Sequence, residues 1–235
     1  MDSLRLDLVH KAPEPRDEES PTGWVTIERG ESRAVLLTPE EIDPGRHYPL
    51  VTVLHGAGRQ DEMLVKACRD APEKHDALFL IPRSVHPTWD LIACDERPDL
   101  DFLTFAYDLI YRRYPIDRER QALVGYSDGA SYALSVGLSN PHVFRAVMGW
   151  AAGFLALDTH QMSADDPKPE LLLEYGTHDE LFPFEQVAVP MRENLEKLGY
   201  RIEFRVDEGG RHWPSGDFQP DALDWFFSEG WEQRS

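Results

Sequence analysis

The pentapeptide Gly125-Tyr126-Ser127-Asp128-Gly129 constrains the fold of this chain more than any other stretch. It follows an apolar run at residues 121–124, typical of a short buried strand, and precedes small, helix-compatible residues at 130–134. A glycine two residues on either side of a serine, between strand and helix, marks a strained turn that exposes the serine hydroxyl at the edge of a sheet. A Cβ at position 125 or 129 would collide with the neighbouring strand or helix backbone. The pattern predicts a strand–turn–helix unit with Ser127 as a candidate nucleophile.

Strand-like and helix-like segments alternate around this unit. Residues 50–54 are β-branched and uncharged, which predicts a central strand buried on both faces. Residues 99–114 repeat apolar side chains every three or four positions, which predicts a helix. The alternation indicates a doubly wound, mostly parallel sheet in a single domain, residues 1–235. Further strands are expected at 77–81 (ended by Pro82), 145–150, 171–175 and 202–206, and further helices at 63–69, 130–138, 184–198 and 221–227.

The N-terminal part has a different pattern. Residues 4–9 and 24–28 alternate apolar and polar side chains, and residues 34–37 form a short apolar run. We expect antiparallel strands there, at one edge of the sheet. Residues 151–170 are irregular, polar and broken by Pro167 and Pro169, so no large lid is expected.

The composition excludes some partners. The net charge of -19 argues against nucleic acid, because phosphate contacts need a basic surface. A solvated acidic surface explains the charge, and a salt-adapted host is the open alternative. No signal peptide or apolar run of about 20 residues stands out, so we expect a cytoplasmic protein without a membrane partner. We also expect Cys68 and Cys94 to be reduced. The oligomeric state stays open, with a homodimer as one option.

An exposed serine needs a base, because its hydroxyl is a poor nucleophile until the proton is removed. Downstream of Ser127 stand four histidines. Only His212 lies just after the last predicted strand and before the last helix, where such a fold places the base. We therefore expect His212 to be the base. The others are His142, His160 and His178.

The base in turn needs a carboxylate that orients it. Asp179 follows the predicted strand at 171–175, so its loop should point towards His212. Glu180 and Asp158 are the competitors; Glu180 should point elsewhere and Asp158 belongs to the preceding strand's loop. Asp179 is the preferred acid.

Negative charge on a tetrahedral intermediate needs backbone N–H donors. One donor should be the N–H of Asp128, the residue after the nucleophile, whose side chain is then free to face outward. The other should come from the glycine-rich turn His55-Gly56-Ala57-Gly58 after the central strand, and we expect it to be the N–H of Ala57.

Four motifs resemble the α/β-hydrolase superfamily, in particular the phospholipase/carboxylesterase and polyhydroxybutyrate depolymerase-like (feruloyl and acetyl esterase-like) branch. They are Leu54-His55-Gly56-Ala57-Gly58, Pro115-Ile116-Asp117-Arg118-Glu119-Arg120, Gly125-Tyr126-Ser127-Asp128-Gly129-Ala130 and Pro141-His142-Val143-Phe144. The resemblance implies Ser127, Asp179 and His212 as a catalytic triad. Depolymerase-like members carry the histidine where this chain has Arg211, a shift of one residue.

The predicted activity is hydrolysis of small-molecule carboxylic esters with short acyl groups, through an acyl-serine and without a metal or organic cofactor. Thioesters, lactones and amides are alternatives on the same three residues. A non-catalytic ligand-binding domain is the alternative from another class. Aromatic candidates for the walls of the pocket are Trp89, Phe182 and Trp213.

Overall fold

The computed structural model describes residues 4–8, 19–93, 96–157, 165–214 and 218–228. Its centre is an eight-stranded sheet with the order β1-β2-β4-β3-β5-β6-β7-β8. Strands β3 to β8 run parallel, and β1 and β2 add an antiparallel edge. The predicted fold class is confirmed. The strands are β1 (Trp24–Arg29), β2 (Ser32–Leu37), β3 (Tyr48–Leu54), β4 (Leu78–Arg83), β5 (Ile116–Tyr126), β6 (Ala146–Trp150), β7 (Glu170–Gly176) and β8 (Ile202–Asp207).

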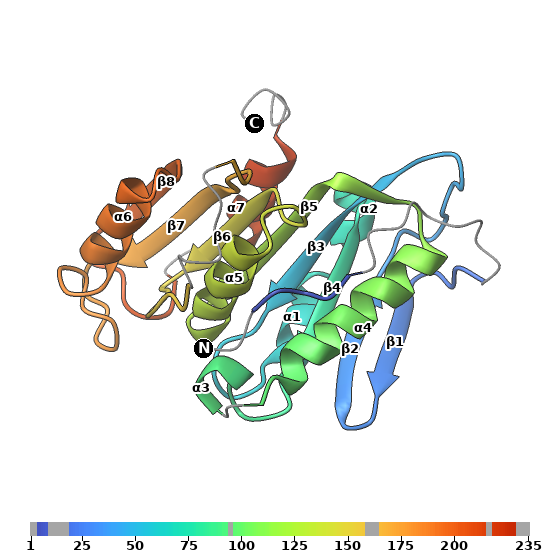
Figure 1. Ribbon diagram of the computed structural model, residues 1–235, viewed down its shortest axis with the longest axis horizontal. Helices are drawn as coiled ribbons and strands as arrows, with labels where there is room; N and C mark the ends of the chain where they lie inside the picture. The colour runs from blue at the N-terminus through green and yellow to red at the C-terminus, as the bar shows by residue number, and fades with distance from the viewer. Residues whose placement is uncertain (1–3, 9–18, 94–95, 158–164, 215–217, 229–235) are drawn as a thin grey trace.

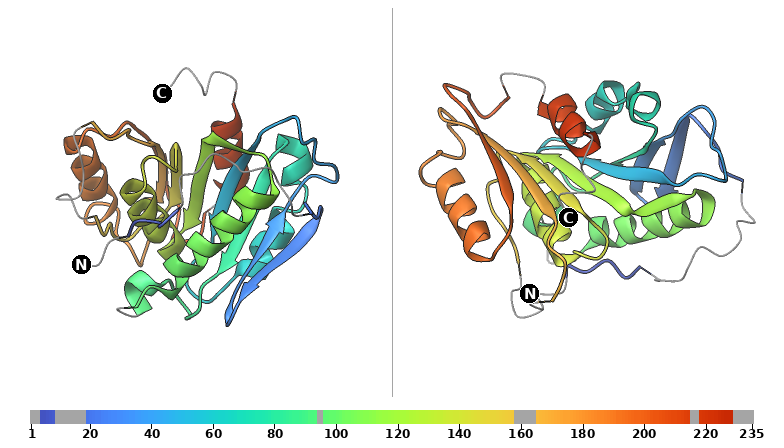
Figure 2. Two further views of the ribbon diagram at one scale, coloured as in Figure 1. Left: turned by 45° about the vertical axis from the view of Figure 1, so that its right-hand side comes forward. Right: turned by 90° about the horizontal axis from the view of Figure 1, so that it is seen from above.

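Helices cover both faces of this sheet (Figures 1 and 2). The helices α4, α5 and α6 lie on one face, and α1, α2 and α7 lie on the other. Because both faces are covered, every residue of β3 and β6 is buried, as their uncharged sequences predict. The helices are α1 (Asp61–Ala67), α2 (Ala71–His75), α3 (Asp90–Ala93), α4 (Pro98–Arg113), α5 (Asp128–Ser139), α6 (Ala188–Lys197) and α7 (Phe218–Phe227).

The parallel register brings the ends of the central strands together. Gly125 on β5 pairs with Leu54 on β3 and with Gly149 on β6. The loops that follow β3, β5, β6, β7 and β8 therefore open at one edge of the sheet. In an open α/β sheet this edge is where ligands bind.

One predicted edge strand is wrong. Residues 4–8 form no strand, although Leu4, Leu6 and Leu8 are buried as the alternation requires. The side chain of Asn140, at the end of α5, accepts a hydrogen bond from the Leu6 N–H (2.7 Å) and donates one to the Leu4 carbonyl (2.8 Å). An asparagine amide can replace a neighbouring strand in this way, because it offers one donor and one acceptor side by side. The alternation of apolar and polar residues at 4–8 therefore reflects an extended chain that buries one side against the rest of the protein, not a strand in the sheet.

The predicted end of the strand at 77–81 is also wrong, because Pro82 lies within β4. Pairing of β4 with β3 stops at Leu80, and Pro82 pairs only with Ala34 on β2. A proline is tolerated where a strand has lost one of its two neighbours. Cys68 is a free, buried thiol, and Cys94 lies outside the described residues.

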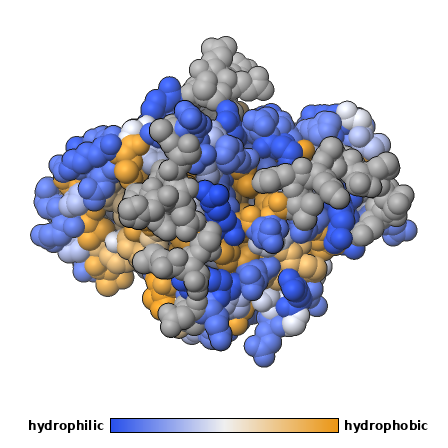
Figure 3. Space-filling view, viewed as in Figure 1, coloured by the Kyte–Doolittle hydropathy of each residue, from blue (hydrophilic) through white to orange (hydrophobic). Residues whose placement is uncertain are grey.

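Two features concern the surface. On the face shown in Figure 3, hydrophilic residues cover much of the left-hand end, and hydrophobic residues show towards the middle. Among the described residues, no helix is long and apolar enough to cross a membrane. The described parts of the segment after β6, residues 151–157 and 165–169, contain no helix.

Candidate active site

Ser127 occupies the turn between β5 and α5 in a strained backbone conformation, with φ 53° and ψ -118°. Few residues other than glycine adopt a positive φ. The two flanking glycines allow the turn to pack closely. A Cβ on Gly125 would lie 2.3 Å from the carbonyl oxygen of Gly129, and a Cβ on Gly129 would lie 2.4 Å from the carbonyl oxygen of Leu54. These are the collisions with helix and strand backbone that the sequence predicts.

The structure brings Ser127, His212 and Asp179 together from loops far apart in the sequence. The Oγ of Ser127 lies 2.9 Å from Nε2 of His212, and Nδ1 of His212 lies 2.8 Å from Oδ2 of Asp179. All three residues are buried. With Nδ1 protonated and bonded to the carboxylate, Nε2 is left as an acceptor facing the serine hydroxyl.

The carboxylate of Asp179 is fixed by its own loop. Its second oxygen, Oδ1, accepts hydrogen bonds from the backbone N–H groups of Leu181 and Phe182, both at 2.8 Å. Its side chain is fully shielded from solvent. Charge-assisted hydrogen bonds of this kind are about twice as strong as neutral ones. Asp179 is therefore held in one orientation towards His212.

The backbone of His212 is held by two aromatic side chains that the sequence analysis did not select. Its carbonyl oxygen accepts hydrogen bonds from the Tyr126 hydroxyl (2.9 Å) and the Trp150 indole N–H (2.7 Å). Burial raises the pKa of Tyr126 well above its ordinary value, aided by the negative charges of Asp179 and Glu180. The hydroxyl therefore stays protonated and remains a donor at working pH. Both residues end a strand, but nothing in the sequence shows where their polar atoms point.

Two glycines let the His212 loop cross the end of β7. A Cβ on Gly176 would lie 2.3 Å from the Gly210 carbonyl oxygen, and a Cβ on Gly210 would lie 2.3 Å from a carboxylate oxygen of Asp207. The Gly210 carbonyl also accepts the N–H of His178 at 2.8 Å. The two loops are thus bonded to each other through residues that directly precede Asp179 and lie two before His212.

The competing candidates lie elsewhere or outside the described residues. Glu180 and His178 are exposed, next to the buried Asp179. His142 is on the surface, 3.2 Å from Asp166. Asp158 and His160 lie outside the described residues.

The backbone N–H groups of Ala57 and Asp128 have no acceptor within the described part of the chain. The Asp128 side chain is half-buried and is not free, although the sequence analysis expects it to be. Its Oδ2 accepts a hydrogen bond from the hydroxyl of Thr88 at 2.5 Å. This bond ties the first residue of α5 to the loop after β4, an attachment that no local pattern reveals.

Trp89 stabilises the turn that carries Ala57 through a hydrogen bond and ring stacking. The indole N–H of Trp89 donates to the His55 carbonyl (2.8 Å), and its ring lies between the rings of His55 and Tyr132, with centroids 4.7 and 4.9 Å away. Burial lowers the pKa of His55, which keeps that imidazole neutral. Its Nε2 accepts the Ser84 N–H, so its Nδ1 donates to the Gly56 carbonyl. Trp89 is only 1% exposed, which places it behind the turn rather than on an open pocket wall.

The other two aromatic candidates flank His212. The ring of Phe182 meets the imidazole edge to face, with centroids 5.2 Å apart. Trp213 is 57% exposed and stacks on Tyr126 at 4.7 Å. The ring of Tyr126 also lies beside the imidazole of His212, with centroids 5.5 Å apart.

The sheet order, the serine turn and the positions of Asp179 and His212 define the α/β-hydrolase fold, and comparison with solved structures agrees. A thermostable esterase superposes with a TM-score of 0.66 at 21% identity, over 87% of this chain and 62% of that one. A carboxylesterase from Mesorhizobium loti superposes with a TM-score of 0.65 at 20% identity, over 88% of this chain and 99% of that one. The predicted resemblance to the esterase branch is confirmed at the level of the fold.

Sequence comparison adds one curated relative. The chain is 25% identical over 116 residues to the S-formylglutathione hydrolase of Paracoccus denitrificans (strain Pd 1222). The match covers 49% of this chain and only 38% of that protein. No protein-family model matches the chain.

Proposed function

We propose that this protein is a serine carboxylesterase that cleaves small-molecule esters through an acyl-serine intermediate. The observation that carries the proposal is the continuous hydrogen-bonded line from the Ser127 hydroxyl through the His212 imidazole to the Asp179 carboxylate. A nucleophile, a base and an orienting acid in this geometry are the requirements for acyl transfer by serine. The esterases of the same fold support the class of substrate.

The first half of the reaction forms the acyl-enzyme. As the Ser127 Oγ attacks the ester carbonyl carbon, Nε2 of His212 takes the hydroxyl proton. The carbonyl oxygen gains negative charge, which the N–H groups of Ala57 and Asp128 would stabilise. Losing one such donor typically costs ~2.7–4 kcal/mol of transition-state stabilisation. The intermediate then collapses, and the alcohol leaves with the proton from His212.

The second half releases the acid. A water molecule gives its proton to Nε2 of His212 and attacks the acyl carbon, and the Ser127 oxygen leaves with that proton. Asp179 holds the imidazole in the required tautomer and stabilises the imidazolium in both halves. It is suited to this role because both of its oxygens are already engaged.

We propose short acyl groups as the preferred substrates. Only irregular chain follows β6 in its described parts, so a pocket beside Phe182 and Trp213 would open directly to solvent. A small apolar pocket gains roughly 0.8 kcal/mol per buried methylene until it is full. Activity on p-nitrophenyl esters should peak between acetate and hexanoate and fall by octanoate, without interfacial activation. A steady rise up to palmitate would point to a lipase instead.

The partial match to an S-formylglutathione hydrolase favours a thioester as the second candidate substrate. The same three residues can cleave either bond, because the attacked carbonyl is common to both. Oxygen and sulfur esters of the same acyl group separate the two. A higher kcat/KM for S-formylglutathione than for a formate oxygen ester would assign the thioester.

Labelling with a fluorophosphonate tests the proposal directly. The probe should add one label to the wild type and none to Ser127→Ala, as measured by intact-protein mass spectrometry. Ser139→Ala is the matched control, since it removes a hydroxyl from the far end of the same helix. Equal labelling of the wild type and Ser127→Ala would rule out Ser127 as the nucleophile.

A further inference from the structure

Four serines stand four residues apart, beginning with the candidate nucleophile: Ser127, Ser131, Ser135 and Ser139. Residues with this spacing share one face of a helix. Each of the last three donates its hydroxyl hydrogen to the carbonyl four residues earlier, at 3.3, 2.7 and 2.7 Å. Such bonds are a common habit of serine in helices and assign no function by themselves.

Two of these serines also bind a second piece of chain. The Oγ of Ser131 accepts the N–H groups of Gly153 (2.9 Å) and Phe154 (3.3 Å), and the Oγ of Ser135 accepts the N–H of Ala156 (3.0 Å). Both serines are fully buried. We call residues 153–156 the docking segment. The docking segment forms neither helix nor strand, so its N–H groups have no backbone acceptor from a neighbouring strand. The hydroxyl oxygens of Ser131 and Ser135 accept these hydrogen bonds instead.

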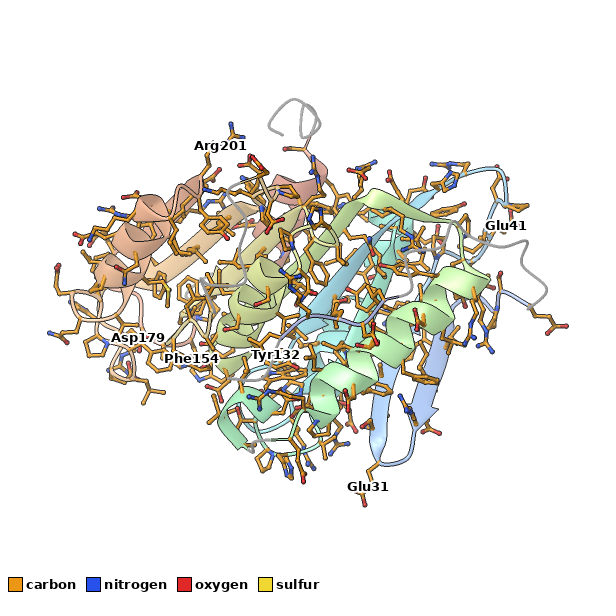
Figure 4. The ribbon with its side chains drawn as sticks, viewed as in Figure 1. Glu31, Glu41, Tyr132, Phe154, Asp179 and Arg201 are labelled. Carbon is orange, nitrogen blue, oxygen red and sulfur yellow. The ribbon has the colours of Figure 1, made fainter. Side chains whose placement is uncertain are left out.

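The docking segment connects the nucleophile's helix to the ring beside the base. It follows Ala151, which has a φ of 51°, an unusual value for alanine. The Tyr175 hydroxyl donates to the Ala152 carbonyl at 3.0 Å and fixes the start of the segment. Gly153 lies against Phe182, where an added Cβ would stand 2.5 Å from the ring. In Figure 4, Phe154 lies between Tyr132 and Asp179, towards the edge where the parallel strands end.

We propose that Ser131 and Ser135 are positioning residues that determine acyl-chain selectivity by fixing the docking segment as a wall of the site. This inference rests on the proposed esterase function. Without either hydroxyl, part-buried N–H groups lose their acceptor, and the segment must move towards water to satisfy them. A wall that moves outward releases Phe182 and admits longer acyl chains.

Amide hydrogen exchange, measured by NMR, tests the docking without any catalytic readout. In Ser131→Ala the amides of Gly153 and Phe154 should exchange on the order of ten times faster than in the wild type, while the Ala156 amide keeps its protection. Ser135→Ala should show the reverse. Ser139→Ala is the control: it loses the same helix bond but no bond to the docking segment. Unprotected amides in the wild type, or equal effects of Ser131→Ala and Ser139→Ala, would overturn the docking.

Kinetics test the selectivity. The ratio of kcat/KM for p-nitrophenyl octanoate to that for the butyrate should rise at least about threefold in Ser131→Ala, through a lower KM for octanoate, because each further methylene buried in the pocket is worth a factor of about four. Ser139→Ala should keep the wild-type ratio. If Ser131→Ala lowers kcat equally for both esters and keeps the ratio, the serine has no role in selectivity. Activity retained in Ser127→Ala would refute the esterase mechanism separately and leave the exchange result valid.

Discussion

The hydrogen bond from Tyr126 to the His212 carbonyl gives the sharpest test of how the proposed base is positioned. Tyr126→Phe removes this donor and keeps the ring that stacks on Trp213. The carbonyl retains its second donor, Trp150, so no buried acceptor is left unpaired. The free energy of unfolding should fall by about 0.5–1.5 kcal/mol, the net value of one hydrogen bond.

Tyr126→Phe should also lower kcat, because His212 shifts when one of the two hydrogen bonds to its carbonyl is lost. A displacement of about 1 Å in a catalytic group costs on the order of 10² in rate, so a smaller shift of His212 should lower kcat roughly tenfold. The KM should stay nearly constant, because the ring of Tyr126 remains. Guanidinium unfolding and p-nitrophenyl butyrate hydrolysis measure the two quantities on the same preparations.

Combining this change with Trp150→Phe refines the test. Each single variant leaves the His212 carbonyl one donor, but the double variant leaves it none within the described structure. An unsatisfied buried carbonyl costs ~1–3 kcal/mol, so the double loss in unfolding free energy should exceed the sum of the single losses by about 1 kcal/mol. The packing defect at Trp150 cancels in this cycle. Strict additivity, together with an unchanged kcat in Tyr126→Phe, would refute the idea that the two aromatic side chains hold His212 in position.

Three further predictions concern the proposed acid Asp179, the buried carboxyl of Asp99 and the loop glycine Gly176. Asp179→Asn should lower kcat by a factor approaching the ~10⁴ seen when a triad acid is neutralised, while the exposed Glu180→Gln stays near wild type in the same ester assay. Burial raises the pKa of Asp99 to about 6, above its value of about 3.9 in an unfolded chain, so the stability it contributes is largest below about pH 4 and is lost as the pH rises through about 6. The difference in unfolding free energy between the wild type and Asp99→Asn should therefore fall across that window and stay flat above it. Gly176→Ala should abolish ester hydrolysis and leave the far-ultraviolet circular dichroism intact, since its Cβ would lie 2.3 Å from the Gly210 carbonyl oxygen and push the His212 loop away; wild-type kcat in this variant would contradict that geometry.

The buried strands and the elbow were predictable because their signals are local. An uncharged β-branched run such as β3 is stable only when both faces are covered. Gly125 is required by a contact within four residues, with the Gly129 backbone, and Gly129 is required where the turn passes the end of β3. The loops that hold Asp179 and His212 follow from strand order, because parallel strands end at one edge of the sheet. These features follow from the local sequence pattern and from the rule that parallel strands end at one edge of the sheet.

The sequence pattern misled at two places where a polar side chain bonds to a residue far away in the chain. Residues 4–8 have the alternation of a strand, yet they bond to Asn140 more than 130 residues away. Asp128 looks free to face solvent in the sequence, yet it bonds to Thr88. No periodicity records a contact of this kind, because it involves single polar atoms.

The sequence alone therefore predicted most of the strands and helices, the turn at Ser127 and the loops that carry Asp179 and His212. Only the tertiary structure decided how these groups are held: Tyr126 and Trp150 on the His212 carbonyl, and Ser131 and Ser135 on the segment after β6. The physical reason is the range of the interactions. Steric and hydrophobic constraints repeat along the chain and can be read from it, whereas a hydrogen bond between distant residues exists only once the packed sheet has brought a donor and an acceptor within 3 Å or so of each other.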